Sequence, residues 1–83
     1  MNRSAYIRQN PADDASAAIG AAVRQAVQRG LGVGRTVKIG TVRGIVIGYN
    51  IARDGNFPGT RFPLLIRTEL GVAKFGLNEV VPA

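Results

Sequence analysis

The chain has 83 residues, which is enough for one domain with one small hydrophobic core. Apolar residues make up 46% of it and charged residues 19%, a balance that excludes a disordered tail, and the formal net charge is +6. Cys and His are both absent, which excludes disulfide bonds, the usual zinc sites and catalysis by Cys or His. We therefore expect a folded, non-enzymatic protein with no catalytic residue, no cofactor, no metal site and no small-molecule substrate.

The N-terminal residues carry no sign of export. Met1 to Ala5 lead into mixed polar sequence without the apolar stretch of a signal peptide. The run Ile45 to Ile47 is only three residues long, whereas a membrane-spanning helix needs roughly 18 or more. We expect a cytoplasmic protein that makes no contact with a membrane.

A helix is predicted near the N-terminus. Asn10 is a favourable N-cap, and Pro11 suits the first helical position. Asp13 and Asp14 complement the positive end of the helix dipole. The helix is expected to run to Arg29. Its apolar positions follow at intervals of four and are rich in small side chains; they are Ala15, Ile19, Val23 and Val27.

Glycines divide the chain into two parts. Gly30 can take the left-handed conformation that ends a helix, and residues 30–34 form a glycine-rich hinge. The first part, residues 1–33, contains an arm or edge strand at 1–9, the helix and the hinge. The second part, residues 34–83, is dominated by β-branched residues and turn signals, so strands are expected there.

Five short strands are predicted in the second part. They are Arg35–Ile39, Val42–Tyr49, Leu64–Leu70, Val72–Phe75 and Val80–Pro82. Asn50–Gly59 is a long loop because it contains the turn dipeptides Asp54-Gly55 and Pro58-Gly59. A tight turn at Gly71 joins the third and fourth strands, and one helical turn at Leu77–Val80 precedes the last.

This order of elements resembles that of SH3-like small β-barrels, among them the KOW-type modules. The similarity is carried by Gly34-Arg35-Thr36-Val37-Lys38-Ile39-Gly40 leading to Gly44-Ile45-Val46, and it covers about residues 34 to 82. The resemblance implies an α+β protein in which an N-terminal helix precedes a five-stranded SH3-like antiparallel β-barrel. The small, Arg-rich, Cys-free chain also has the look of a bacterial phage or prophage accessory protein.

The second strand carries apolar residues on both faces. With strict alternation, Val42 and Val46 share one face while Ile45, Ile47 and Tyr49 share the other. Because a barrel buries only its inner face, the outer face needs a cover, and we expect the helix or its copy from another chain to supply it. This pattern favours an interaction or assembly module that binds a protein partner or itself.

The basic charge supports a second hypothesis, that the barrel binds nucleic acid. Nine Arg and two Lys are present, and residues 30–83 hold seven cations against three anions. Arginine suits phosphate because its planar fork donates two parallel hydrogen bonds. A candidate binding face combines cations with aromatic residues on the strands and the long loop. Its members are Arg43, Tyr49, Arg53, Phe57, Arg61, Arg67 and Lys74.

Overall fold

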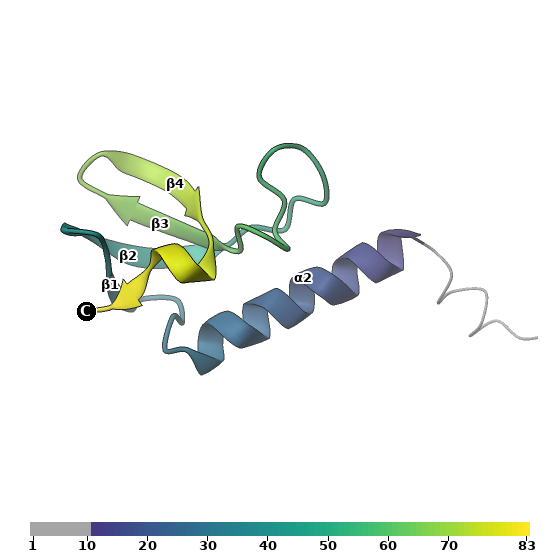
Figure 1. Cartoon of the computed structure of the whole chain (residues 1–83), viewed down its shortest axis with the longest axis horizontal. Coiled ribbons are helices and arrows are strands. Elements are labelled where there is room, and N and C mark those ends of the chain that lie inside the picture. Colours follow the sequence, from purple (N-terminus) through teal and green to yellow (C-terminus); the bar gives the residue numbers. More distant parts are fainter. Residues whose placement is uncertain (1–10) are drawn as a thin grey trace, which may run out of the picture.

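The computed structural model describes the backbone of residues 11–83 and the side chains of residues 15–83. One helix, five strands and a short 3-10 turn follow one another along the chain (Figure 1). They are α2 (Pro11–Gln28), β1 (Thr36–Ile39), β2 (Val42–Tyr49), β3 (Leu64–Thr68), β4 (Gly71–Phe75), η1 (Leu77–Glu79) and β5 (Val81–Pro82). The arm or edge strand predicted for residues 1–9 and the Asn10 cap lie outside the described residues.

Helix α2 ends at Gln28, one residue before the predicted Arg29, and Gly30 terminates it as the sequence predicts. Gly30 has a φ of 80°, the left-handed conformation that glycine takes without steric cost. Its N–H donates to the carbonyl of Val27 at 3.0 Å, and the N–H of Leu31 donates to the carbonyl of Ala26 at 2.9 Å. These two bonds form a Schellman motif, in which the residue after the glycine folds back onto the last turn of the helix. Leu31 is thereby brought against Ala26.

The strands form one antiparallel sheet in the order β4-β3-β2-β1-β5. The α+β class and the five antiparallel strands are confirmed. Within the described residues no backbone pairing joins β4 to β5, so the sheet is open where a closed barrel was expected. One cause is the shortness of β5, whose two residues pair only with Val37 and Lys38 of β1.

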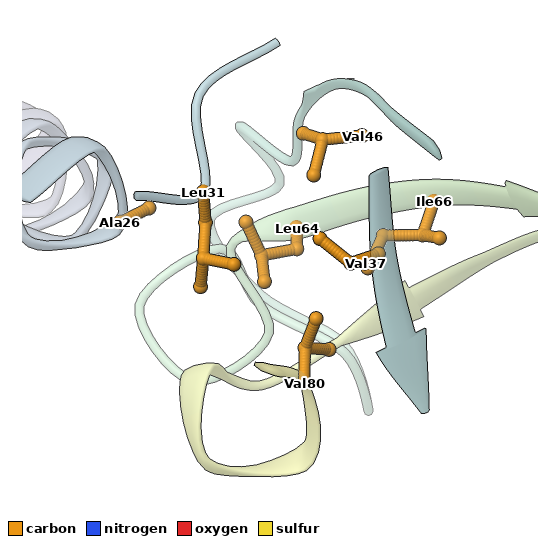
Figure 2. Close-up of a cluster of buried hydrophobic side chains, with 7 residues drawn as sticks. All are labelled: Ala26, Leu31, Val37, Val46, Leu64, Ile66 and Val80. Atoms are coloured by element: carbon orange, nitrogen blue, oxygen red, sulfur yellow. The ribbon is translucent and has the colours of Figure 1, made fainter. Parts of the chain in front are cut away.

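The core lies on the inner face of this sheet, at the C-terminal end of the helix. Figure 2 shows the buried side chains gathered between the helix end and the strands. They are Ala26, Leu31, Val37, Val46, Leu64, Ile66 and Val80, all between 0% and 5% exposed. Because α2, the hinge and strands β1, β2 and β3 each contribute to this cluster, the helix and the sheet share one core.

The chain's own helix leaves the outer face of the sheet uncovered. Ala26 packs into the inner cluster, while Ile45 and Ile47 stay 39% and 38% exposed. Figure 1 shows α2 extending away from the sheet from its C-terminal end. The expectation that this helix packs across the exterior is therefore wrong for a single chain, because the Schellman motif directs the helix end to the inner side. Cover by a copy of the helix from another chain stays a prediction.

None of the helices in the described range combines the length and the hydropathy that crossing a bilayer requires.

Residues 50–63 connect β2 to β3 and are organised by the buried side chain of Asn50, which is 5% exposed. Its Nδ2 donates to the carbonyls of Phe57 at 2.7 Å and Phe62 at 3.0 Å, and its Oδ1 accepts from the N–H of Ala52 at 3.0 Å. Gly59 passes so close to the backbone of Asn50 that a Cβ there would collide with the Asn50 carbonyl. A single side chain thus holds both ends and the middle of the loop.

Replacing Asn50 should destabilise the whole protein. In Asn50→Ala, the carbonyls of Phe57 and Phe62 and the N–H of Ala52 lose their partner, which we expect to cost about 2 to 4 kcal/mol. Urea unfolding followed by circular dichroism measures the change. Asn56→Ala, an exposed position in the same loop, is the matched control and should stay within about 0.5 kcal/mol of the parent. Equal stabilities for the two variants would contradict the role of Asn50.

Candidate functional site: the outer face of the sheet

A β-bulge in β2 decides which residues face outward. Val46 pairs with Ile66 and Gly48 pairs with Leu65, so Ile47 is an extra residue between them. Such a bulge shifts the alternation of side chains by one position. Ile45 before the bulge and Ile47 within it are exposed, whereas Tyr49 after it pairs with the fully buried Leu64 and packs against the core.

Tyr49 is consequently not part of an outward-facing patch. Its ring is partly buried, and its hydroxyl donates to the carbonyl of Leu31 at 3.1 Å. This bond joins the end of β2 to the hinge that follows the helix. The sequence expectation that Tyr49 lies beside Ile45 and Ile47 is wrong, because strict alternation does not survive the bulge.

The register places one set of side chains together on the surface that we call the outer face. Lys38 of β1 pairs with Arg43 of β2, and Ile45 pairs with Arg67 of β3. Arg67 in turn pairs with Val72 of β4, and Leu65 pairs with Lys74. Directly paired residues of antiparallel strands point to the same side of a sheet. The outer face consists of Thr36, Lys38, Arg43, Ile45, Ile47, Leu65, Arg67, Val72 and Lys74.

This face is mixed in character, with cations set among aliphatic side chains. Ile45, Ile47 and Val72 are 39%, 38% and 56% exposed. Arg43 and Arg67 are exposed beside them, and within the described residues neither guanidinium has a hydrogen-bond partner. A surface of this kind offers apolar contact and charge to the same partner.

A shallow hollow of about 360 Å³ lies at the end of the outer face near the β3–β4 turn. Its walls include the two arginines and one carboxylate, and they are formed by Thr36, Arg43, Gly44, Ile45, Arg67, Thr68 and Glu69. Gly44 also lines the hollow, and its inner side has no room for a side chain, because a Cβ there would meet the buried side chain of Ile66 at 2.6 Å. The excess of guanidinium over carboxylate makes the hollow attractive to anionic groups.

The remaining predicted residues belong to the loop of residues 50–63, where their side chains make contacts within the chain. Arg53 donates to the Ser16 hydroxyl of α2 at 3.0 Å. The rings of Phe57 and Phe62 pack edge to face at 5.1 Å, and the Arg61 guanidinium lies 5.9 Å from the Phe62 ring centre. The loop leaves the sheet at the end opposite the β3–β4 turn (Figure 1).

The structure therefore divides the predicted set. Arg43, Arg67 and Lys74 share the outer face, whereas Arg53, Phe57 and Arg61 lie on the loop and Tyr49 points inward. Sequence analysis had placed Ile45 and Ile47 on one face of the second strand, but its candidate binding set lacked both of them, together with Thr36, Lys38, Leu65 and Val72. The Gly40-Thr41 turn could have located Lys38, because a two-residue turn sets Lys38 opposite Arg43.

The carboxylates of the described residues do not form a metal site. No three of them gather within reach of one ion in this part of the chain. Glu79 is used by the fold, since its Oε1 accepts from the N–H of Gly76 at 2.7 Å and so fixes the turn before β5.

Comparison of the chain with protein-family models, with curated protein sequences and with solved structures finds no match.

Tyr49→Phe separates a structural role from a binding role. The variant loses the hydroxyl that bonds to Leu31, and we expect it to be less stable by about 0.5 to 1.5 kcal/mol in urea unfolding. Binding of any ligand to the outer face should be unchanged, because the hydroxyl points away from it. If the variant lost binding while its stability was unchanged, Tyr49 would have to be part of the binding surface.

Proposed function

We propose that the protein is a small, non-enzymatic interaction and assembly module built on an open variant of the SH3-like barrel. The fold assignment is supported by the five antiparallel strands and by the short 3-10 turn that precedes a last strand beside the first. The absence of Cys and His from the sequence supports a binding role over a catalytic one.

The observation that carries the proposal is the uncovered outer face. Its aliphatic side chains would be costly to expose without a purpose, since apolar area kept in water forgoes burial energy of about 25 cal/mol per Å². Arg43 and Arg67 flank Ile45 there, so the fitting partner is a protein surface with apolar groups surrounded by carboxylates.

Nucleic acid is the second candidate, favoured by the charge of the same face. Lys38, Arg43, Arg67 and Lys74 occupy it, while Glu69 is the acid in its hollow. No aromatic ring of the described residues shares this face, so base stacking is not expected. Binding of this kind would rest on phosphate contacts, with affinity that depends on salt more than on sequence.

The protein-partner hypothesis is tested with a photo-crosslinking residue at Ile47. We expect it to capture a discrete partner, and Ile45→Asp should then weaken binding of that purified partner by about tenfold or more. Ile51→Asp is the matched control, because Ile51 is 74% exposed but lies on the loop. Equal losses from the two substitutions would exclude the outer face as the binding surface.

The nucleic-acid hypothesis is tested by two double charge reversals with the same effect on net charge. Arg43→Glu/Arg67→Glu alters the outer face, and Arg53→Glu/Arg61→Glu alters the loop. Fluorescence anisotropy of labelled oligonucleotides at several salt concentrations should show that only the first pair abolishes or strongly weakens binding. Any binding that persists should have a salt dependence that is flatter by about one unit for each phosphate that is no longer neutralised. Similar effects of both pairs would mean that net charge alone is responsible.

A further inference from the structure

The two open edges of the sheet differ in their capacity to pair with another strand. At β5, the N–H of Ala83 donates to the carbonyl of Thr36 at 3.0 Å. Main-chain groups of successive residues point to alternate sides of an antiparallel strand. The nitrogen of Pro82 therefore faces the open edge, where it has no hydrogen to donate. Proline at such a position blocks the addition of a further strand.

The edge of β4 carries no such block. The N–H of Asn50 donates to the carbonyl of Pro63 at 2.9 Å, so the main-chain groups of Leu64 and Ile66 point toward β4. Their partners there are Phe75 and Ala73. The alternate residues, Val72 and Lys74, direct their N–H and C=O groups outward from the sheet. Figure 1 shows β4 as an outermost strand, and its residues 71–74 are exposed.

We propose that the β4 edge pairs with the β4 edge of a second copy, antiparallel across a two-fold axis at Ala73. The two sheets would then continue into one another. The outward groups of Val72 and Lys74 would make four hydrogen bonds with Lys74 and Val72 of the second copy. An isologous contact of this kind closes after two chains. It goes beyond the binding role of the outer face and does not depend on it.

The side chains of β4 fit this register. Lys74 faces Val72 of the second copy, so no two like charges are directly opposed. Ala73 faces its own copy with a small side chain on each side of the axis. Gly71, which has no side chain to pack, faces Phe75 of the second copy, and an aromatic ring opposite an edge glycine is a stabilising pair.

The dimer would also cover an apolar hollow of about 270 Å³ next to Gly71. Its lining includes Ile39, Val42, Leu70 and Ala73, and Leu70 is 84% exposed. Phe75 of the second copy, which packs against the core of its own chain, would stand beside this hollow on the Gly71 side. The short edge and this hollow together make a modest contact, so we expect a dissociation constant in the micromolar range, near the weak end of specific interfaces.

Disulfide trapping tests the register directly, because the chain contains no Cys of its own. Residues on the axis are a non-hydrogen-bonded pair with Cα atoms about 4.5 Å apart, within the range that a disulfide spans. With oxidised glutathione as the oxidant, Ala73→Cys should form a covalent dimer about tenfold faster or more than Thr41→Cys, an exposed turn position. Equal rates would overturn the proposed pairing.

A second measurement uses a substitution that blocks strand pairing at the β4 edge and leaves the hydrogen bonds between β3 and β4 in place. Val72→Pro deletes an outward N–H, whereas Val72→Thr keeps it with a similar shape. Sedimentation equilibrium from micromolar to millimolar concentration should find Val72→Pro monomeric and Val72→Thr dimeric. A dimeric Val72→Pro that retains the parent's circular dichroism would overturn the proposal.

Amide hydrogen exchange of the unmodified protein decides the question even where the proline variant does not fold. The amides of Val72 and Lys74 should become protected as protein concentration rises, while those of Ala73 and Phe75 are protected at every concentration. Salt should strengthen the dimer, because it screens the repulsion between two chains of charge +6. Salt weakens nucleic-acid binding, so failure of the dimer and failure of the outer-face proposal give different results. Val72 and Lys74 amides that exchange freely at every concentration would exclude the dimer.

Discussion

The three hydrogen bonds of the Asn50 side chain are the constraint on which the rest of the structure depends. They close residues 50–63 on themselves, so β3 starts beside the end of β2 and Leu64 faces Tyr49. Backbone polar groups of the loop that water does not reach need hydrogen-bond partners within the protein. The buried side-chain amide of Asn50 supplies three of these hydrogen bonds. Arg53 of the same loop donates a hydrogen bond to Ser16 of α2. The loop is therefore a second point of contact for the helix, in addition to the packing of Ala26 in the core.

Two local backbone features then determine which surface of the sheet is left uncovered. The Schellman motif at Gly30 fixes the helix end to the inner side of the sheet through Ala26 and Leu31. The bulge at Ile47 turns Tyr49 inward and leaves Ile45 and Ile47 outward. Neither feature involves the cations of the outer face. The residues that make this face basic and apolar are therefore separate from the residues that form the core.

Much of the fold could be predicted from the sequence because its signals are local. Gly30 ends the helix, β2 has the predicted bounds Val42–Tyr49, and a helical turn precedes the last strand. The sidedness of Tyr49 could not be predicted, since a bulge depends on how two strands pair and leaves no mark in the alternation of one of them.

Closure of the sheet was the other feature that residue pattern could not decide. Whether strands meet to form a barrel depends on their lengths and their tilt, neither of which is set by residue pattern alone. β5 has only two residues, and Pro82 removes the donor that a neighbouring strand would use. The candidate site was predicted only in part. The number of cations can be counted from the sequence, but the face of the sheet on which each cation lies depends on the register of the strands.

The open edge and the outer face meet in β4 without competing for the same atoms. In a strand, side chains point out of the plane of the sheet while the main-chain groups lie within it. Lys74 can thus offer its ammonium group to a ligand on the outer face and its N–H to a second copy at the edge. Two paired copies would join their outer faces into one basic surface, and an anionic ligand bound across it would offset the repulsion between the chains. Because coupling between two binding equilibria is reciprocal, a ligand that spans both copies must favour the dimer to the same degree that the dimer favours the ligand.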